Sequence, residues 1–128
     1  MKSILLRRTA NWKRVFFSVL TLLELSGLAA AAWTADSDGN WSDINNWDSL
    51  VLIPNSSLHT ANFGNVITAD TIVYVDKAIS VKSINITSDY SYTIAATNGG
   101  SLSVYEEITL NETSAAATIS APLDIPFN

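Results

Sequence analysis

The sequence predicts an all-β protein: a short right-handed parallel β-solenoid with an irregular, Trp-rich N-terminal cap, preceded by a signal-peptide helix. Three observations lead to this fold class. From residue 66 onward, short segments rich in Ile, Val, Thr, Tyr and Leu alternate apolar with polar residues, as strands that bury one face do. These segments recur with a period in the low twenties, which is typical of coiled β-repeats. No helical 3.6-residue period follows Ala32, so helices are not expected there.

The repeat defines which residues should be buried. Three segments recur at offsets of 23, 24 and 25 positions, namely residues 79–81 as 102–104, 84–86 as 108–110, and 92–96 as 117–121. In a solenoid each coil buries its apolar residues against the next coil, so matching residues form ladders. We therefore expect an inward set of Ile79, Val81, Ile84, Ile86, Leu102, Val104, Ile108 and Leu110, and an outward set of Ser80, Asn85, Ser103 and Thr109. A β-sandwich is the alternative, but two-residue hairpin turns are scarce.

Residues 1–32 have the three parts of a secretory signal peptide. Five of the seven basic groups lie in the first fourteen residues, an apolar run covers residues 15–23, and four alanines occupy residues 29–32. We expect cleavage after Ala32, which makes Trp33 the first mature residue. An uncleaved membrane anchor is the alternative, because residues 15–32 approach the roughly 20 that a spanning helix needs. Either outcome predicts an exported protein, secreted or held at the cell surface.

The expected mature part is strongly acidic. Residues 33–128 hold eleven acidic residues against Lys77 and Lys82, a net charge of 2 − 11 = −9. Such a surface repels nucleic acid and anionic lipid. No nucleic-acid partner is therefore expected, and a membrane contact only through an uncleaved signal segment. The chain contains no Cys, which excludes disulfides, a thiol nucleophile and a Cys-based zinc site.

Composition divides the mature part into a cap at residues 33–65, rich in Trp, Asn, Asp and Ser, and a strand-repeat region at residues 66–128 that holds an incomplete solenoid. Trp33, Trp41 and Trp47 in the cap are candidate ligand-binding residues, because flat indoles can stack on sugar rings. The favoured interpretation is that they plug the open end of the solenoid core, since a solenoid needs a terminal cap.

Asp36, Asp38 and Asn40 are weak candidate metal ligands. They stand at the 1-3-5 spacing with which a calcium-binding loop begins. An EF-hand also needs Gly at position 6 and Glu at position 12, where this chain has Trp41 and Trp47. A hydrogen-bonded turn is therefore the favoured role, and apart from weakly indicated Ca²⁺ no cofactor is expected.

No catalytic centre is expected. His59 has no second His or Cys with which to bind a metal. Glu106 and Glu107 are adjacent, so on a strand they point to opposite faces and do not form a catalytic pair. Nothing in the sequence selects another pair from the eleven acidic residues.

The cap carries a resemblance to a known family. Trp33, Thr34 and the runs at residues 38–42 and 45–47 resemble the W-T…G-D-G-N-W-S-x-x-x-N-W opening of exported bacterial proteins with autotransporter-associated β-strand repeats, and the similar openings of PEP-CTERM-type surface proteins. Later motifs follow the order typical of that family, at Pro54 and at residues 61–64, 72–75, 81–86 and 117–123. The resemblance covers residues 33–125 and implies the N-terminal region of a longer surface protein.

Together these observations favour an exported structural or interaction module of a bacterial surface or secreted β-solenoid protein, without catalytic activity. Its expected partners are further coils of a longer solenoid or other copies of the chain, with polysaccharide as a further candidate. The alternative is a carbohydrate-binding module, or the first coils of a β-helix enzyme that degrades polysaccharide.

Overall fold

The computed structural model describes residues 29–126, and residues 1–28 of the expected signal peptide lie outside this part. The chain alternates between two sheets whose paired strands are all parallel. One sheet has the order β1 (Ala30–Ala32), β3 (Ser56–Phe63), β5 (Ala78–Ile86), β7 (Ser101–Leu110) and β9 (Leu123–Asp124). The other has the order β2 (Gly39–Asn40), β4 (Thr71–Val75), β6 (Tyr92–Ala96) and β8 (Ala117–Ile119).

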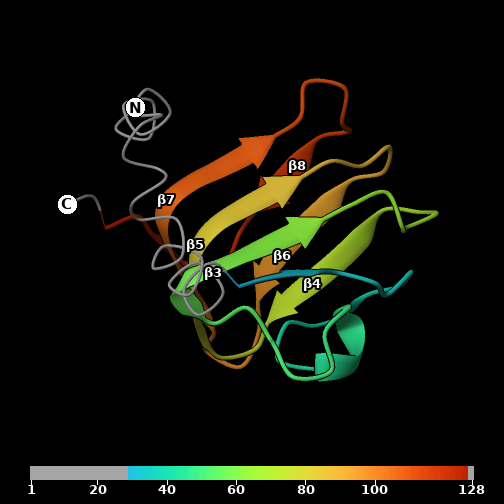
Figure 1. Cartoon of the computed structure of the whole chain (residues 1–128). Coiled ribbons are helices and arrows are strands. Elements are labelled where there is room, and N and C mark those ends of the chain that lie inside the picture. Colours follow the sequence, from blue (N-terminus) through green and yellow to red (C-terminus); the bar gives the residue numbers. More distant parts are fainter. Residues whose placement is uncertain (1–28, 127–128) are drawn as a thin grey trace, which may run out of the picture.

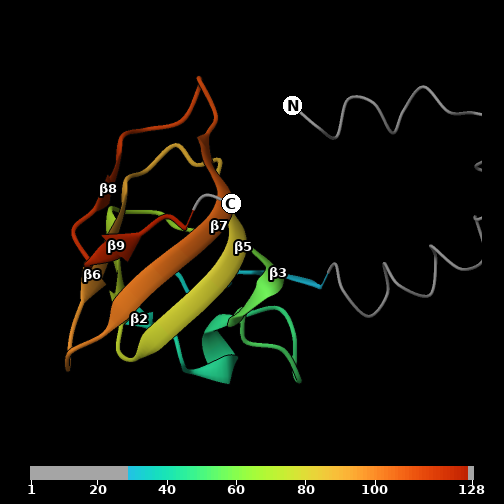
Figure 2. The same ribbon diagram turned by 90° about the vertical axis from the view of Figure 1, so that its left-hand side faces the viewer.

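Each strand from β1 to β7 pairs with the second strand that follows it, β1 with β3 and β2 with β4, so the backbone winds as a β-solenoid of about three turns (Figure 1). The view turned by 90° shows β3, β5 and β7 as one layer that faces β6 and β8 (Figure 2). A short 3₁₀ helix, η1 (Ile44–Asn46), lies between β2 and β3. The predicted all-β solenoid is confirmed. Among residues 29–126 no helix is long and apolar enough to cross a membrane.

The register between coils confirms the repeat found in the sequence. The predicted offsets of 23, 24 and 25 positions are all present, as the pairs Ile79↔Leu102 and Val81↔Val104, Ile84↔Ile108 and Ile86↔Leu110, and Tyr92↔Ala117 and Ile94↔Ile119. The change from 23 to 24 occurs at a register shift between Val81 and Ser83.

The core lies between the two sheets and takes one face of each strand. In β4 every second residue is buried, and β6 begins with the same alternation, because successive side chains of a strand point to opposite faces. Six of the eight predicted core residues are at most 2% exposed: Ile79, Val81, Ile84, Ile86, Leu102 and Val104. The expected outward residues Ser80, Asn85, Ser103 and Thr109 are partly or fully exposed.

The prediction was wrong for Leu110 and too strong for Ile108. Leu110 is 46% exposed, and Ile108 is only partly buried against the core. Both lie in the second half of β7, whereas β9 pairs with Leu102 and Ser103 in the first half. No described strand therefore covers the edge of β7 beside these two residues.

The ladders begin earlier in the chain than residue 66, the expected start of the repeat region. β2 and β3 lie within residues 33–65, the expected irregular cap, and each pairs with a strand of the following coil. Ala30–Ala32, which the sequence assigns to the end of the signal peptide, forms β1 and pairs with β3.

The turn from β6 to β7 passes very close to the preceding coil. Asn98 and Gly99 have φ values of 52° and 75°, in the left-handed region that Asn and Gly tolerate best. Gly100 follows, and a Cβ placed on it would lie 1.8 Å from the carbonyl oxygen of Val75. Only glycine allows the two backbones to approach this closely.

Candidate functional site

Five aromatic side chains fill the core at the N-terminal end of the solenoid: Trp33, Trp41, Trp47, Phe63 and Tyr92. The Phe63 ring is central, with centroid distances of 5.5 Å to Trp41, 5.6 Å to Trp47 and 5.2 Å to Tyr92. Trp33 and Trp47 meet edge to face at 5.4 Å, an arrangement that aromatic pairs favour. The three tryptophans are at most 4% exposed. Their burial fits the interpretation as a core plug, and they form no exposed platform for sugar rings.

The indole nitrogens are all paired inside this plug. Trp33 Nε1 donates to the carbonyl oxygen of Ala35 at 2.9 Å, Trp41 Nε1 to that of Pro54 at 2.8 Å, and Trp47 Nε1 to that of Trp41 at 2.8 Å. A buried polar group without a partner is costly. These bonds therefore allow the large indoles to be buried, and they fix the irregular cap backbone around them.

Tyr92 links the plug to the next coil. Its hydroxyl donates to the carbonyl oxygen of Gly64 at 2.9 Å. Burial, together with the negative charge of Asp36, raises the pKa of Tyr92 to about 12. Both effects favour the neutral hydroxyl, which is the form that donates this bond.

The N-terminal edge of the first sheet is closed by the chain itself. Trp33 and Trp47 form an antiparallel bridge. The Asp48 backbone N–H donates to the carbonyl oxygen of Ala32 at 2.8 Å, and the Ala32 N–H donates to Asp48 Oδ1 at 2.8 Å. Residues 46–48 thus pair with Ala32 and the residues just after it, on the side of the chain that faces away from β3, where an open strand would expose unpaired backbone groups.

Two of the three candidate calcium ligands accept hydrogen bonds from the following coil. Asp36 accepts from the backbone N–H of Thr68 at 2.6 Å and from its hydroxyl at 2.9 Å. Asp38 accepts from the N–H of Ile72 at 2.7 Å, and Asn40 lies in β2. Residues 29–126 contain no group of three or more His, Asp or Glu side chains placed to hold a metal ion.

Similar bonds connect the later coils, and the sequence analysis missed them. Asn65 and Asp89 bond reciprocally: the Asn65 side-chain amide donates to Asp89 Oδ2 at 2.8 Å, and the Asp89 N–H donates to Asn65 Oδ1 at 3.1 Å. Asn62 accepts from the Asn85 side-chain amide at 3.0 Å on the outer face of the first sheet. The signal was available in the sequence, because these polar pairs stand 24 and 23 positions apart, at the period of the apolar ladder.

One further bond of this kind ties the cap to the first full coil. The Ser42 N–H donates to Asp76 Oδ1 at 3.1 Å, and the Ser42 hydroxyl donates to Asp76 Oδ2. Desolvation opposes the ionisation of Asp76, but these hydrogen bonds to its carboxylate outweigh it and lower its pKa.

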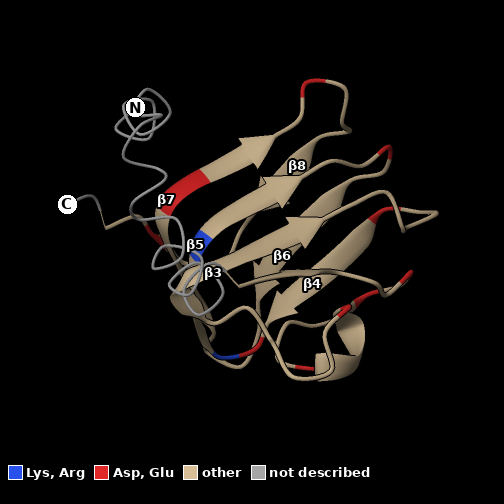
Figure 3. Cartoon of the chain, in the orientation of Figure 1, with Lys and Arg blue, Asp and Glu red and all other residues tan. Residues whose placement is uncertain are grey.

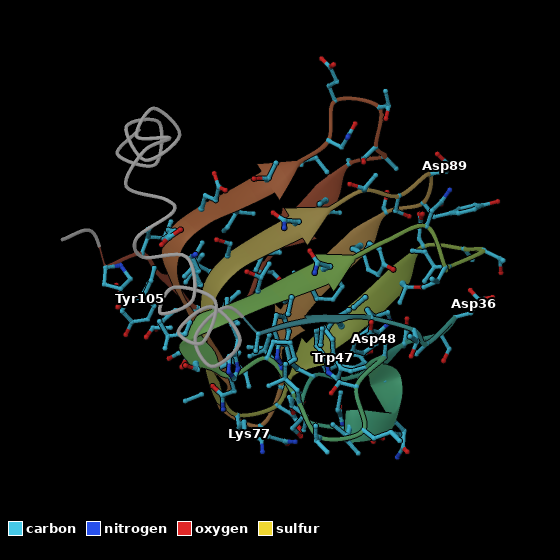
Figure 4. The ribbon with its side chains drawn as sticks, in the orientation of Figure 1. Asp36, Trp47, Asp48, Lys77, Asp89 and Tyr105 are labelled. Carbon is cyan, nitrogen blue, oxygen red and sulfur yellow. The ribbon has the colours of Figure 1, made fainter. Side chains whose placement is uncertain are left out.

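Charged residues lie mainly at turns and strand ends, as Figure 3 shows. Asp36 and Asp89 lie on one edge of the solenoid, at turns that follow β1 and β5, and Lys77 lies on another edge (Figure 4). Within the described part of the chain the basic residues are Lys77 and Lys82. Lys82 Nζ lies 3.7 Å from Glu106 Oε2, a partly exposed pair that contributes little to stability.

The other residues weighed for chemistry do not assemble into a centre. Glu106 and Glu107 are both exposed, at the register shift of β7. His59 Nδ1 accepts from the backbone N–H of Asn55 at 3.3 Å. Each of these residues therefore has a local role or faces solvent.

The C-terminal end of the solenoid differs from the N-terminal end in the first sheet, where within residues 29–126 β9 has no bridge like the one that follows β1. β8 and β9 are the last strands of their sheets within residues 29–126, and each pairs with one strand. Apolar side chains are exposed around this edge: Leu110 at 46%, Leu123 at 41% and Ile125 at 37%. We call β8, β9 and these three side chains the open end.

Comparisons with known proteins add no relative. No protein-family model matches the chain, and no curated protein and no solved structure is found to be similar to it.

Proposed function

We propose that this chain is an exported structural module that begins a bacterial surface or secreted β-solenoid, with a scaffolding rather than a catalytic role. In this proposal the N-terminal end terminates the solenoid, and the open end accepts further parallel β-coils. The observation that carries the proposal is the difference between the two ends of the same core.

At the N-terminal end the core is plugged by buried aromatic rings, and residues 46–48 pair with the C-terminal part of the edge strand β1. Natural β-proteins block exposed edges in this way, because an open edge pairs with other strands.

The open end has the features of a stacking surface. The backbone of β8 and β9 presents the edge of a parallel ladder, and Leu110, Leu123 and Ile125 place apolar surface beside it. Repeat proteins gain stability when each coil buries its neighbour. A further coil of the same kind, with alternating apolar residues, would cover these side chains and continue both ladders.

Export is the second part of the proposal. Its support is the order of basic, apolar and small residues in the first 32 positions. The high net negative charge suits a protein that remains soluble outside the cell. The resemblance to β-strand repeat proteins of bacterial surfaces points to the same location.

The test is light scattering on the exported protein over a wide concentration range, with two matched lysine variants. Leu123→Lys puts a charge on the open end, where edge lysines oppose strand addition. Leu50→Lys changes a leucine that is 94% exposed in the loop between η1 and β3. We expect the wild type and Leu50→Lys to self-associate as concentration rises, and Leu123→Lys to stay monomeric.

Two outcomes would contradict the proposal. A wild-type protein that remains monomeric at the highest concentration would show that the open end does not recruit β-structure. Association that is lost in Leu50→Lys and kept in Leu123→Lys would place the contact on the loop instead.

A further inference from the structure

We propose that signal peptidase cuts this chain between Ala29 and Ala30, three residues before the site that the alanine run first suggests, so that the mature protein keeps β1. The inference rests on the proposed export of the chain, and it identifies the bond that is processed during export.

The first argument is the structural role of the three alanines. Ala30–Ala32 pairs in parallel with residues 60–62 of β3. Ala31 is 2% exposed and belongs to the core. The Thr60 N–H also donates to the carbonyl oxygen of Ala29 at 3.0 Å, and this one bond is lost with a cut after Ala29 or at any later position. A cut after Ala32 would remove this strand and expose the edge of β3.

The second argument is where the new positive charge would lie. Cleavage creates an α-ammonium group on the next residue. A cut after Ala32 would place it on Trp33, which is fully buried and whose backbone nitrogen donates to the carbonyl oxygen of Asn62 at 2.9 Å. Burying an ammonium group without a counter-charge is costly.

The position of the new charge and the residues lost also distinguish the cuts after Ala29, Ala30 and Ala31. A cut after Ala30 would charge the buried Ala31. A cut after Ala31 would set the charge on Ala32, near the Asp48 carboxylate, but would remove Ala31 from the core. A cut after Ala29 places the charge on Ala30, which is exposed, and keeps all three ladder pairs.

The sequence around Ala29 suits the enzyme. Signal peptidase requires small residues three positions and one position before the cut. Gly27 and Ala29 occupy these positions for a cut after Ala29, just as Ala30 and Ala32 do for a cut after Ala32. Both bonds satisfy the enzyme, but only a cut after Ala29 yields a mature chain that keeps all of β1 and carries its new charge on an exposed residue.

The experiment uses the full chain, expressed in a secreting bacterium, with intact-mass measurement and N-terminal sequencing of the exported fraction. Two variants each block one candidate bond by placing a large residue directly before it. We expect the wild type to begin at Ala30, Ala32→Leu to begin at the same residue, and Ala29→Leu to be processed elsewhere or to remain uncut.

The outcomes separate the two proposals. An exported protein that begins at Ala31, Ala32 or Trp33, or one that is exported with its leader intact, overturns this inference and leaves export standing. A full-length chain retained in the cytoplasm contradicts the proposed export and this inference with it.

Discussion

Gly100→Ala should strongly destabilise the protein, because Gly100 lies against the backbone of the preceding coil with no room for a Cβ. The added methyl carbon would lie 1.8 Å from the carbonyl oxygen of Val75, 2.6 Å from its carbonyl carbon and 3.1 Å from the backbone nitrogen of Lys77. All three atoms are backbone, so no side chain can rotate away. Relief requires the coils to move apart by about 1 Å or more, in a stack whose strands are only about 4.8 Å apart. We expect a cost of about 3 kcal/mol, the upper end of the usual range for overpacking.

The assay is urea unfolding followed by the fluorescence of the buried tryptophans. With a urea slope of about 1.5 kcal/mol per molar, such a loss lowers the midpoint by about 2 M. Two matched variants isolate the cause. Gly99→Ala meets no atom within 4 Å but has φ of 75°, so it should cost roughly 1 kcal/mol. Gly64→Ala also meets no atom and has an ordinary φ, so it should be almost neutral. Equal midpoints for Gly100→Ala and Gly64→Ala would refute the close packing of the coils.

Three further predictions test the register, the core and the Tyr92 hydroxyl. A double Ser80→Cys and Ser103→Cys variant should react rapidly within one molecule with a short thiol cross-linker, since these residues are paired neighbours and the chain has no other Cys. The single variants are the control, and a failure of the double variant to cross-link would contradict the register. Val104→Ala should cost about 1–3 kcal/mol and Leu110→Ala under about 1 kcal/mol, because Val104 is 0% and Leu110 46% exposed; equal urea midpoints would contradict this assignment. The pKa of Tyr92 is raised from 10.0 to about 12 in the folded state. Its contribution to the free energy of unfolding should therefore be complete below pH 10 and be lost as the pH rises through 12. Unfolding curves of Tyr92→Phe should lack this loss, and an identical alkaline loss of stability in both proteins would refute the prediction.

The sequence was sufficient to predict the parallel register, because stacking imposes a fixed spacing on inward apolar residues. Ile79 and Leu102 stand 23 positions apart for the same reason that they lie side by side. The prediction failed at Leu110 because periodicity shows which face of a strand is apolar, but not whether another coil covers it.

The boundaries of the first coil were harder to predict for a different reason. Its ladder offset is 30 positions, from Ala30 to Thr60, since the cap and η1 are inserted between β2 and β3. Ala30–Ala32 also has no alternation of apolar and polar residues, and its small residues match a signal-peptide exit equally well. The pairing and burial of Ala31 show the strand, which the sequence did not reveal.

The roles of the candidate site residues could be predicted only in part. Burial of the three tryptophans follows from the need to plug the core, and the sequence favoured it. The partners of Asp36 and Asp38 could not be predicted, because a 1-3-5 spacing describes a local loop. Their hydrogen bonds reach Thr68 and Ile72, more than thirty positions away.

The most direct test of the central claim, that one end of the solenoid is closed and the other open, is amide hydrogen exchange at low and high protein concentration. The amides of Trp33 and Asp48 donate to carbonyl oxygens at the closed end, so they should exchange slowly at both concentrations. Within residues 117–124, the amides of Ser120 and Ala121 donate to the carbonyl oxygen of Ile94, so they should be protected at both concentrations. The segment's amides that point away from β6 and β7 should exchange quickly in dilute protein and become protected only as concentration rises. Slow, concentration-independent exchange at those outward amides, or fast exchange at Trp33 and Asp48, would contradict the account.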